Sequence, residues 1–296
     1  MKKTVQEDEE GLRLFKKTSI EVQKYVDSLK FEEFDIRKQL EDRKASTVFI
    51  CAKRNTGKTF LTECLLSQIP DFYSEVFVFS MTANLQKNEF KYVPSENIFT
   101  GLDEEKLTQI WEQKKAQVQR MEAQGIAKNK MPVTLIIMDD LISDPKCRNS
   151  EILNRIYVAG RHVSICIFFI SQTISSKYGI TNVMKQNCDI VISFYLSNMY
   201  DRKALIEQFL SSRSAETGLA IFDKITHQQY NSICIANHVV DKNPLKYIFY
   251  YKGYKPKPFS IGNKRQSTVV INKPQKSEPI IGFIKSSDKK EDFFYN

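Results

Sequence analysis

The stretch Thr47–Thr59, TVFICAKRNTGKT, contains the feature that decides the fold. It opens with an apolar, β-branched run and continues through a polar turn to Gly57 and Lys58. After the turn, apolar residues recur at helical spacing over residues 60–66. A strand, a glycine-containing turn and a helix in this order are typical of a phosphate-binding loop, because the loop N–H groups and the helix N-terminus point at one place.

Residues 52–60 supply the contacts expected of such a loop. Lys58 carries a positive charge for the β- and γ-phosphates, and Thr59 offers a hydroxyl to Mg²⁺. The usual pattern, G-x-x-x-x-G-K-[ST], has a glycine where this chain has Ala52, and alanine resists positive φ. The expected nucleotide-binding residues are Ala52, Lys53, Arg54, Asn55, Thr56, Gly57, Lys58, Thr59 and Phe60.

Length and composition indicate an ordinary globular protein. The 296 residues suffice for one large or two small domains, and 42% are hydrophobic and 27% charged. No apolar run approaches the ~20 residues of a membrane span, and the N-terminus has no apolar segment of a secretory signal. The six cysteines form no C-x-x-C pair and the three histidines have no ligand spacing. We therefore expect buried free thiols in a reducing, intracellular compartment, without a disulfide framework or a zinc site.

The formal net charge is +9. Such an excess favours a polyanionic partner, above all nucleic acid, but a solvated lysine-rich surface explains the charge equally well.

The chain divides into three expected parts. Residues 1–44 form an N-terminal helical segment, residues 45–254 form an α/β domain, and residues 255–296 form a basic flexible tail. Apolar runs alternate with helical patterns in the middle part, which predicts a mostly parallel sheet with right-handed crossovers. Strands are expected at 48–51, 75–80, 133–138, 163–170 and 189–196, helices at 103–124, 149–159, 182–187 and 200–210, and an antiparallel pair at 231–239 and 246–251.

Two adjacent acids follow the apolar strand 133–138. At the tip of that strand Asp139 can hold Mg²⁺ through its water shell, and Asp140 can polarise a water as general base. The plain alternative is that the two aspartates only begin a turn.

Gln172 follows the next buried strand, 163–170. An amide there can bond both a lytic water and a γ-phosphate oxygen, although a turn glutamine is the alternative. Arg161, which precedes this strand, can reach across a subunit interface as an arginine finger. Arg148 and Arg155 compete for that role, and a surface salt bridge is the other reading of Arg161.

The motifs resemble those of the poxvirus-type genome-packaging ATPases of large DNA viruses and virophages, within the FtsK–HerA superfamily. The resemblance runs from about Thr47 to Phe194, through AKRNTGKT, FVFSMTAN, LIIMDD, AGRHVSICIFFISQT and QNCDIVISF. It implies a three-layer P-loop NTPase of the additional-strand type, with one strand between the Walker A and Walker B strands. It also implies ATP and Mg²⁺ as cofactors.

The resemblance further implies a homo-oligomeric ring, a pentamer or hexamer, that translocates double-stranded DNA without regard to sequence. The DNA would enter a preformed capsid, with a capsid or portal protein as partner, in the host cytoplasm or viral factory and in the virion. By the same carry-over Asp139 is the Walker B metal residue, Asp140 the catalytic acid and Gln172 the sensor. Much of the superfamily has glutamate where Asp140 stands, and aspartate is one methylene shorter.

Four other functions remain open from the residues alone. A terminase would need a nuclease domain with clustered acids, which residues 197–296 do not show, and a helicase uses the same core. A nucleoside kinase would need a lid and a base-binding site that the sequence does not locate. A nucleotide-dependent assembly protein would need Lys58 but neither Asp140 nor Gln172.

Overall fold

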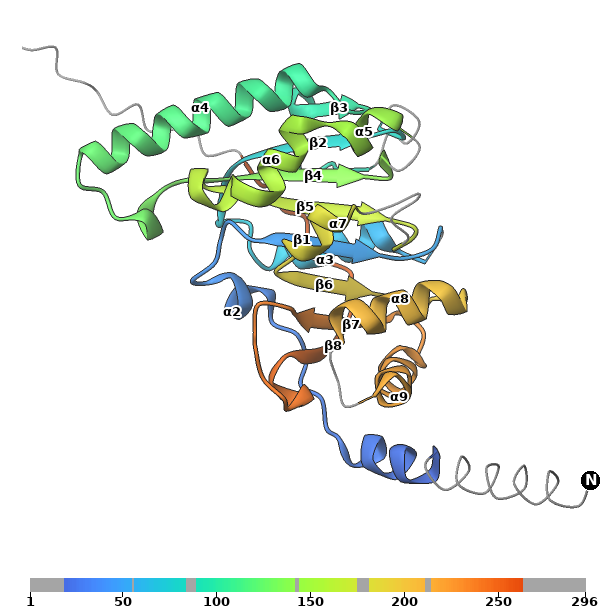
Figure 1. Ribbon diagram of the computed structural model, residues 1–296. Coiled ribbons are helices and arrows are strands. Elements are labelled where there is room, and N and C mark those ends of the chain that lie inside the picture. Colours follow the sequence, from blue (N-terminus) through green and yellow to red (C-terminus); the bar gives the residue numbers. More distant parts are fainter. Residues whose placement is uncertain are drawn as a thin grey trace, which may run out of the picture. The chain divides into compact units, whose positions relative to one another are not determined.

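The computed structural model describes residues 19–54, 56–83, 89–141, 144–174, 181–210 and 214–262. Within this part the chain forms an eight-stranded sheet in the order β3-β2-β4-β5-β1-β6-β7-β8 (Figure 1). The strands are β1 Thr47–Cys51, β2 Tyr73–Ser80, β3 Ile98–Thr100, β4 Val133–Asp139, β5 Ile165–Ser171, β6 Ile190–Ser193, β7 Asn231–Ala236 and β8 Ile248–Lys252.

The first six strands run parallel, and β7 and β8 continue the sheet antiparallel at the β6 edge. β5 pairs with β1 on one side and with β4 on the other. The strand that leads into the phosphate-binding loop and the strand that carries the two acids are therefore separated by one strand. The predicted mostly parallel sheet with its antiparallel C-terminal extension is confirmed.

Helices cover both faces of the sheet. They are α2 Ile36–Leu40, α3 Lys58–Ser67, α4 Glu104–Ala123, α5 Pro145–Asn149, α6 Glu151–Ala159, α7 Asn182–Gln186, α8 Met199–Phe209 and α9 Ala215–Thr226. Side chains alternate along β1, where Phe49 joins one apolar cluster and Ile50 the other. The first cluster takes in α4, α6, α8 and α9, and the second takes in α2 and α3. This arrangement gives the three layers.

Local signals set several boundaries. The Asp103 side chain accepts a hydrogen bond from the Lys106 backbone N–H and caps α4, as expected for a helix that begins there. Residues 160–163 form a 3₁₀ turn and Ser164 is left-handed, so β5 begins at Ile165, two residues later than expected. The strand β3 and the helix α9 were not predicted.

The N-terminal segment is held against the domain from residue 19 onward. Residues 19–28 are helical, and the buried side chains of Val26 and Leu29 join the core. Lys224 Nζ donates to the backbone carbonyls of Val26, Asp27 and Leu29, at 2.8, 3.1 and 2.7 Å. Residues 1–18 lie outside the described part.

Residues 255–262, the start of the expected tail, pack beside β2. The Phe259 ring stacks on Tyr92 with centroids 5.0 Å apart, and Ile261 N–H donates to the Tyr92 carbonyl. Gly262 has φ +78°, and a Cβ there would lie 2.8 Å from Val76 N, so this position requires glycine. Residues 263–296 lie outside the described part.

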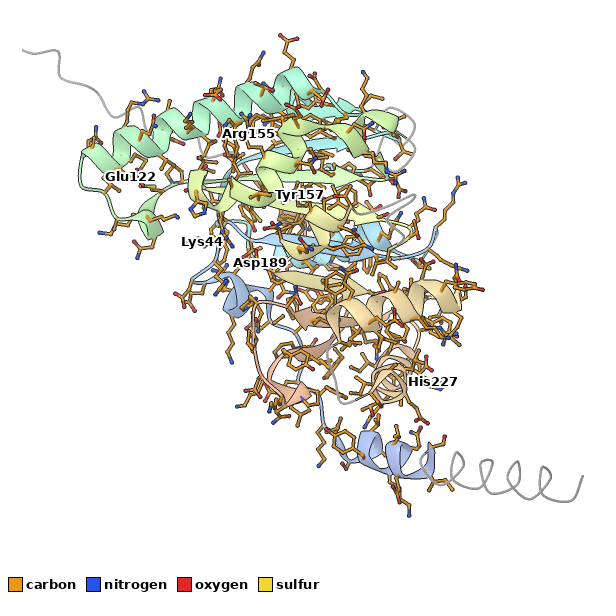
Figure 2. All side chains as sticks on the ribbon, viewed as in Figure 1. Lys44, Glu122, Arg155, Tyr157, Asp189 and His227 are labelled. Carbon is orange, nitrogen blue, oxygen red and sulfur yellow. The ribbon has the colours of Figure 1, made fainter. Side chains whose placement is uncertain are left out.

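Every side chain of β1, β4 and β5 is buried, and Figure 2 draws the side chains on the ribbon. All six cysteines are buried with free thiols, as predicted. Among the described helices, none has the length and apolar character needed to pass through a bilayer.

Candidate functional site

The loop between β1 and α3 has the backbone that a phosphate-binding loop requires. Gly57 has φ +96°, which favours glycine, although a Cβ there would meet nothing within 4 Å. Ala52, at the usual first-glycine position, is not among the residues with positive φ, so alanine fits there without strain. The Thr56 N–H and hydroxyl both donate to the Lys53 carbonyl, which tightens the turn. Asn55 lies outside the described residues.

Lys58, Asp140 and Gln172 meet at the carboxyl edge of the sheet. Lys58 Nζ lies 2.6 Å from Asp140 Oδ1, and Gln172 Nε2 donates to Asp140 Oδ2 at 3.1 Å. Lys58 belongs to the first turn of α3, Asp140 follows β4 and Gln172 follows β5. Because β4, β5 and β1 are parallel neighbours, their carboxyl ends deliver these three side chains to one place.

Asp140 reaches Lys58 through an uncommon backbone conformation. Its φ is +49°, in the left-handed region, and its N–H donates to the Ile170 carbonyl at 3.2 Å. A non-glycine residue in this region is energetically costly and is found mostly where the surroundings enforce it. The Lys58 side chain is only 7% exposed, so the ion pair is largely shielded from water.

Asp139 points into the protein and has an unused oxygen. The residue is 3% exposed, Oδ2 accepts a hydrogen bond from Ser80 Oγ at 3.3 Å, and Oδ1 is buried without a partner. Burial, and then the neighbouring charge of Asp140, raise the pKa of Asp139 to about 7. A buried carboxylate with a free oxygen suits a cation, so Asp139 fits its predicted role as a ligand of Mg²⁺. The predicted hydroxyl ligand, Thr59, is half-buried in the first turn of α3.

The metal would rest on few protein ligands. In the part of the chain that the structure describes, no three His, Cys, Asp or Glu side chains gather to hold a metal. This agrees with the way Mg²⁺ is usually bound in proteins, by one or two carboxylates together with waters and substrate phosphates.

Sequence reasoning missed a polar chain that leads away from Asp139. Ser80 pairs with Asp139 in the β2–β4 register, and its hydroxyl lies 3.1 Å from Thr82 Oγ1. Thr82 Oγ1 in turn donates to Glu89 Oε2 at 3.4 Å. Burial raises the pKa of Glu89 above its usual range. The signal in the sequence was the serine that ends the predicted strand 75–80. It became informative only when the structure showed that β2 pairs with β4.

The loop after β6 also borders the site. Lys53, in the phosphate-binding loop, forms a hydrogen bond with Ser197. Thr173, next to Gln172, donates to Asp201 in the first turn of α8 at 2.8 Å. These two contacts fix the phosphate-binding loop and the segment after β5 to the beginning of α8.

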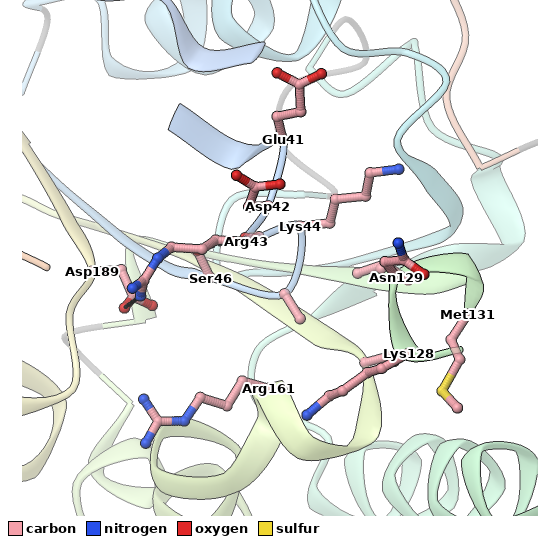
Figure 3. A pocket seen from close by; sticks show the side chains of 13 residues that line it. Glu41, Asp42, Arg43, Lys44, Ser46, Lys128, Asn129, Met131, Arg161 and Asp189 are labelled. Carbon is pink, nitrogen blue, oxygen red and sulfur yellow. Dashed lines mark hydrogen bonds and ion pairs between the residues drawn. The ribbon is translucent and has the colours of Figure 1, made fainter. Parts of the chain in front are cut away.

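The structure places Arg161 at the amino ends of the strands, opposite the carboxyl ends that carry the Lys58 site. It precedes β5 while Gln172 follows it, and the seven residues of β5 span roughly 20 Å. Arg161 lines a pocket of about 380 Å³ at the amino ends of β1, β4, β5 and β6, together with Arg43, Lys128 and Asp189 (Figure 3). Arg43 extends toward Asp189, with 3.9 Å between Nη1 and Oδ1. Within one subunit, therefore, Arg161 does not join the Lys58 site.

The competing arginines differ from Arg161 in their contacts. The Arg155 guanidinium lies over the Trp111 ring, 6.0 Å from its centroid, and Arg148 is also engaged within the chain. Among the described residues Arg161 has no hydrogen-bond or ion-pair partner, and its side chain is exposed.

Comparisons with solved structures bear on the fold. The genome packaging NTPase B204 from Sulfolobus turreted icosahedral virus 2, in complex with AMPPCP, is 15% identical, with 72% of this chain and 99% of that chain covered and a TM-score of 0.47. The pCW3 conjugation coupling protein TcpA with ATPγS is 10% identical, with 74% and 62% covered and a TM-score of 0.54. EssC (ATPases 2 and 3) from Geobacillus thermodenitrificans is 13% identical, with 73% and 40% covered and a TM-score of 0.49. At these identities the likeness to TcpA supports the fold alone.

Comparisons of the sequence bear on the family. The curated proteins gave no match. Residues 32–252 match the family described as Poxvirus A32 protein, and this match takes in every described strand and all the site residues named above. It extends well beyond the motifs on which the resemblance rested. The chain therefore belongs to the Poxvirus A32 protein family.

Proposed function

We propose that this protein is an ATP-hydrolysing motor that translocates double-stranded DNA into a preformed viral capsid. One observation carries the enzymatic part of the proposal: Lys58, Asp140 and Gln172 are joined by direct contacts at the carboxyl ends of adjacent parallel strands. A cation, a carboxylate and an amide in that position are the groups that hydrolysis of a terminal phosphate requires.

Binding begins with an exchange of partners at Lys58. The triphosphate lies on the N–H groups of the loop and the start of α3, and its β- and γ-oxygens replace Asp140 at the Lys58 ammonium. Thr59 and Asp139 would hold Mg²⁺, which supplies positive charge on the β- and γ-phosphates. The released Asp140 carboxylate then faces the terminal phosphate.

Hydrolysis uses the two groups that remain in contact. Asp140 accepts a proton from a water whose oxygen attacks the γ-phosphorus, and the bond to the β–γ bridging oxygen breaks. Gln172 orients this water and the transferred phosphoryl group through its amide. The products are ADP and phosphate.

The DNA-moving part of the proposal is supported by the family and by the net charge of +9. Contacts to phosphates carry no sequence information, which suits a motor that must pass every sequence. In a homo-oligomeric ring the exposed Arg161 of one subunit serves the nucleotide of its neighbour, and a capsid or portal protein anchors the ring to the capsid.

The test compares Lys58→Ala with Lys91→Ala, which removes an exposed lysine outside the site. We expect Lys58→Ala to lower steady-state ATP hydrolysis at least 100-fold, because the charge that stabilises the terminal phosphates is lost. Lys91→Ala keeps wild-type turnover. We also expect double-stranded DNA to stimulate the wild-type rate, with a stimulation that weakens as salt rises.

Each departure from this pattern has its own meaning. Wild-type turnover by Lys58→Ala would contradict the assignment of the nucleotide site to Lys58. ATP turnover that neither DNA nor salt affects would contradict the proposed DNA-translocating function. Tight ATP binding with no multiple turnover identifies an assembly switch in place of an ATPase.

A further inference from the structure

Phe60 is an aromatic side chain left partly in water at the proposed nucleotide site. It lies in the first turn of α3, two residues after Lys58, and is 40% exposed. We propose that the base of the bound nucleotide stacks on the Phe60 ring, and that the site therefore accepts nucleoside triphosphates with little regard to the base. This inference rests on the proposed function, because it takes the triphosphate to lie at Lys58.

Helix geometry sets the direction in which the nucleoside leaves the phosphate site. Residues two apart on an α-helix are about 200° apart around its axis, so Lys58 and Phe60 leave α3 on nearly opposite sides. The Lys58 side marks the γ-phosphate end, because Lys58 contacts Asp140 there. The phosphate chain crosses the helix start, and its nucleoside end therefore emerges on the Phe60 side.

The backbone between these side chains is free to hold the phosphates. The first intrahelical bond of α3 runs from Leu61 N–H to the Gly57 carbonyl. The N–H groups of residues 58–60 have no partner within the helix, as in the first turn of any α-helix. A triphosphate that uses them ends beside Phe60.

Gly253 holds the ring in place. A Cβ at Gly253 would lie 3.2 Å from Phe60 Cε1 and 3.5 Å from Cδ1, so part of the ring rests on the chain just after β8. That segment is fixed to α3 because Cys64 Sγ donates to the Tyr254 carbonyl at 2.7 Å. The ring is thus supported by the protein on one part of its surface and open to a ligand on the rest.

Stacking recognises a base by its face. Every nucleobase presents a flat π-surface, so an aromatic platform binds all of them with similar strength. A phenylalanine ring also has no hydrogen-bonding group with which to read the base edge. The triphosphate would supply most of the affinity, and the ring would add a contribution that is blind to the type of base.

The experiment uses three variants of the full chain, Phe60→Ala, Phe60→Leu and Phe60→Trp. Leucine is the matched control for apolar bulk, because it keeps an apolar side chain but has no π-face. For Phe60→Ala and Phe60→Leu we expect KM for both ATP and CTP to rise about 10-fold while kcat stays within about 2-fold. Phe60→Trp restores KM. Inhibition by inorganic tripolyphosphate, which has no base, is unchanged in all three.

Three results would overturn the inference. The first is an unchanged KM in Phe60→Ala, and the second is a loss of tripolyphosphate inhibition that equals the loss of ATP affinity. The third is a wild-type preference of more than about 100-fold for one base, since stacking alone does not discriminate so strongly.

A binding readout separates this inference from the proposed function. The wild type has one tryptophan, the buried Trp111, so a fluorescence change that Phe60→Trp shows and the wild type does not show reports the platform. This change should occur with ATP but not with tripolyphosphate. A protein that binds ATP with this signature but does not turn it over contradicts the motor and supports the platform. Normal turnover without the signature contradicts the platform alone.

Discussion

At the scale of single residues, Asp140 combines two opposing tasks. Its carboxylate is the proposed general base, yet in this structure it neutralises Lys58 at 2.6 Å, which is the charge that a triphosphate needs. The left-handed backbone at φ +49° turns the short aspartate side chain toward the lysine. The ion pair therefore occupies the lysine charge that would bind phosphate, until an anion that binds Lys58 more tightly displaces the carboxylate.

The competition predicts a split between affinity and rate for Asp140→Asn. The amide cannot accept a proton from water, so kcat should fall about 10²–10⁴-fold. It also carries no negative charge to hold Lys58 or to repel phosphate, so the Kd for ATP should fall several-fold. Single-turnover hydrolysis and equilibrium binding of ATP measure the two effects separately.

Gln172→Ala serves as the comparison for that variant. It removes a hydrogen bond to the same carboxylate but leaves the charge of Asp140 and the ion pair with Lys58 in place. We expect slower hydrolysis without the tighter binding of ATP. Asp140→Asn with weakened ATP binding would show that the ion pair does not compete with the nucleotide.

Most residues of the site were predictable because they stand where a buried strand ends. Asp139, Asp140 and Gln172 end or follow apolar runs, and Lys58 begins the helix after the loop that follows β1. Parallel strands collect their carboxyl ends on one side of the sheet. Ser80 also follows such a run, but its meaning comes from its β2–β4 register with Asp139. That register depends on tertiary pairing, which local pattern does not contain.

At the scale of elements, prediction succeeded where a segment was buried on both faces. β1, β4 and β5 read as continuous apolar runs because helices cover both sides of the sheet. β3 is only three residues long and half exposed, so it leaves no such run. α9 contains a glycine and two threonines, which are weak helix formers, and it is stabilised by packing on β7 and α8.

The same burial of the strands has a consequence at alkaline pH. Burial raises the pKa of Cys51 and Cys166 to about 12 and that of Cys64 to about 11, from a value of 9.0 for an exposed thiol. It also raises the pKa of the other three thiols. A group whose folded pKa is raised stabilises the fold fully below its unfolded pKa, and this stability is lost as pH rises through and above 9.

We expect the free energy of unfolding to fall steeply between pH 9 and pH 10. Each thiol that ionises only in the unfolded chain contributes a loss of about 1 kcal/mol over that interval, so six contribute about 6 kcal/mol. A typical domain has about 5–15 kcal/mol in total. Lys114, whose pKa burial lowers to about 8, and Lys185, whose pKa burial also lowers, act in the opposite direction, but they are two groups against six. Urea unfolding under reducing conditions at several pH values measures the slope.

Cys234→Val separates the thiol effect from other alkaline effects. Valine suits a buried strand, and Cys234 lies in β7 with no exposed surface. This variant should lose about 1 kcal/mol less than the wild type between pH 9 and pH 10. An identical slope in the variant, or a flat stability profile in the wild type, would show that the thiols do not govern the transition.

At the scale of the whole molecule, the carboxyl ends and the amino ends of the parallel strands carry complementary halves of one proposed site. The carboxyl ends of the strands hold Lys58, Asp140 and Gln172, and the amino ends hold the exposed Arg161 beside its pocket. Since the length of β5 separates them within a subunit, the arginine can serve a nucleotide only in another copy of the chain. A ring that repeats one heterologous contact would bring such ends together at every interface.

Mixing two inactive variants tests whether Arg161 acts between subunits. Lys58→Ala lacks a working loop but keeps its arginine, and Arg161→Ala has the converse defect. If the site is shared, each variant alone is nearly inactive. Random assembly of equal amounts then gives about a quarter of interfaces with both parts intact, and with them about a quarter of wild-type ATPase activity.

Arg155, one of the two competing arginines, provides the control for this experiment. Arg155 lies over Trp111, so Arg155→Ala should keep its own activity, and mixing it with Lys58→Ala should only dilute that activity. A mixture of the Lys58 and Arg161 variants that is no more active than the average of the two would assign Arg161 to its own subunit or to the surface. Recovery above that average requires that one subunit's loop and another subunit's arginine work on the same nucleotide, because no single chain in the mixture contains both.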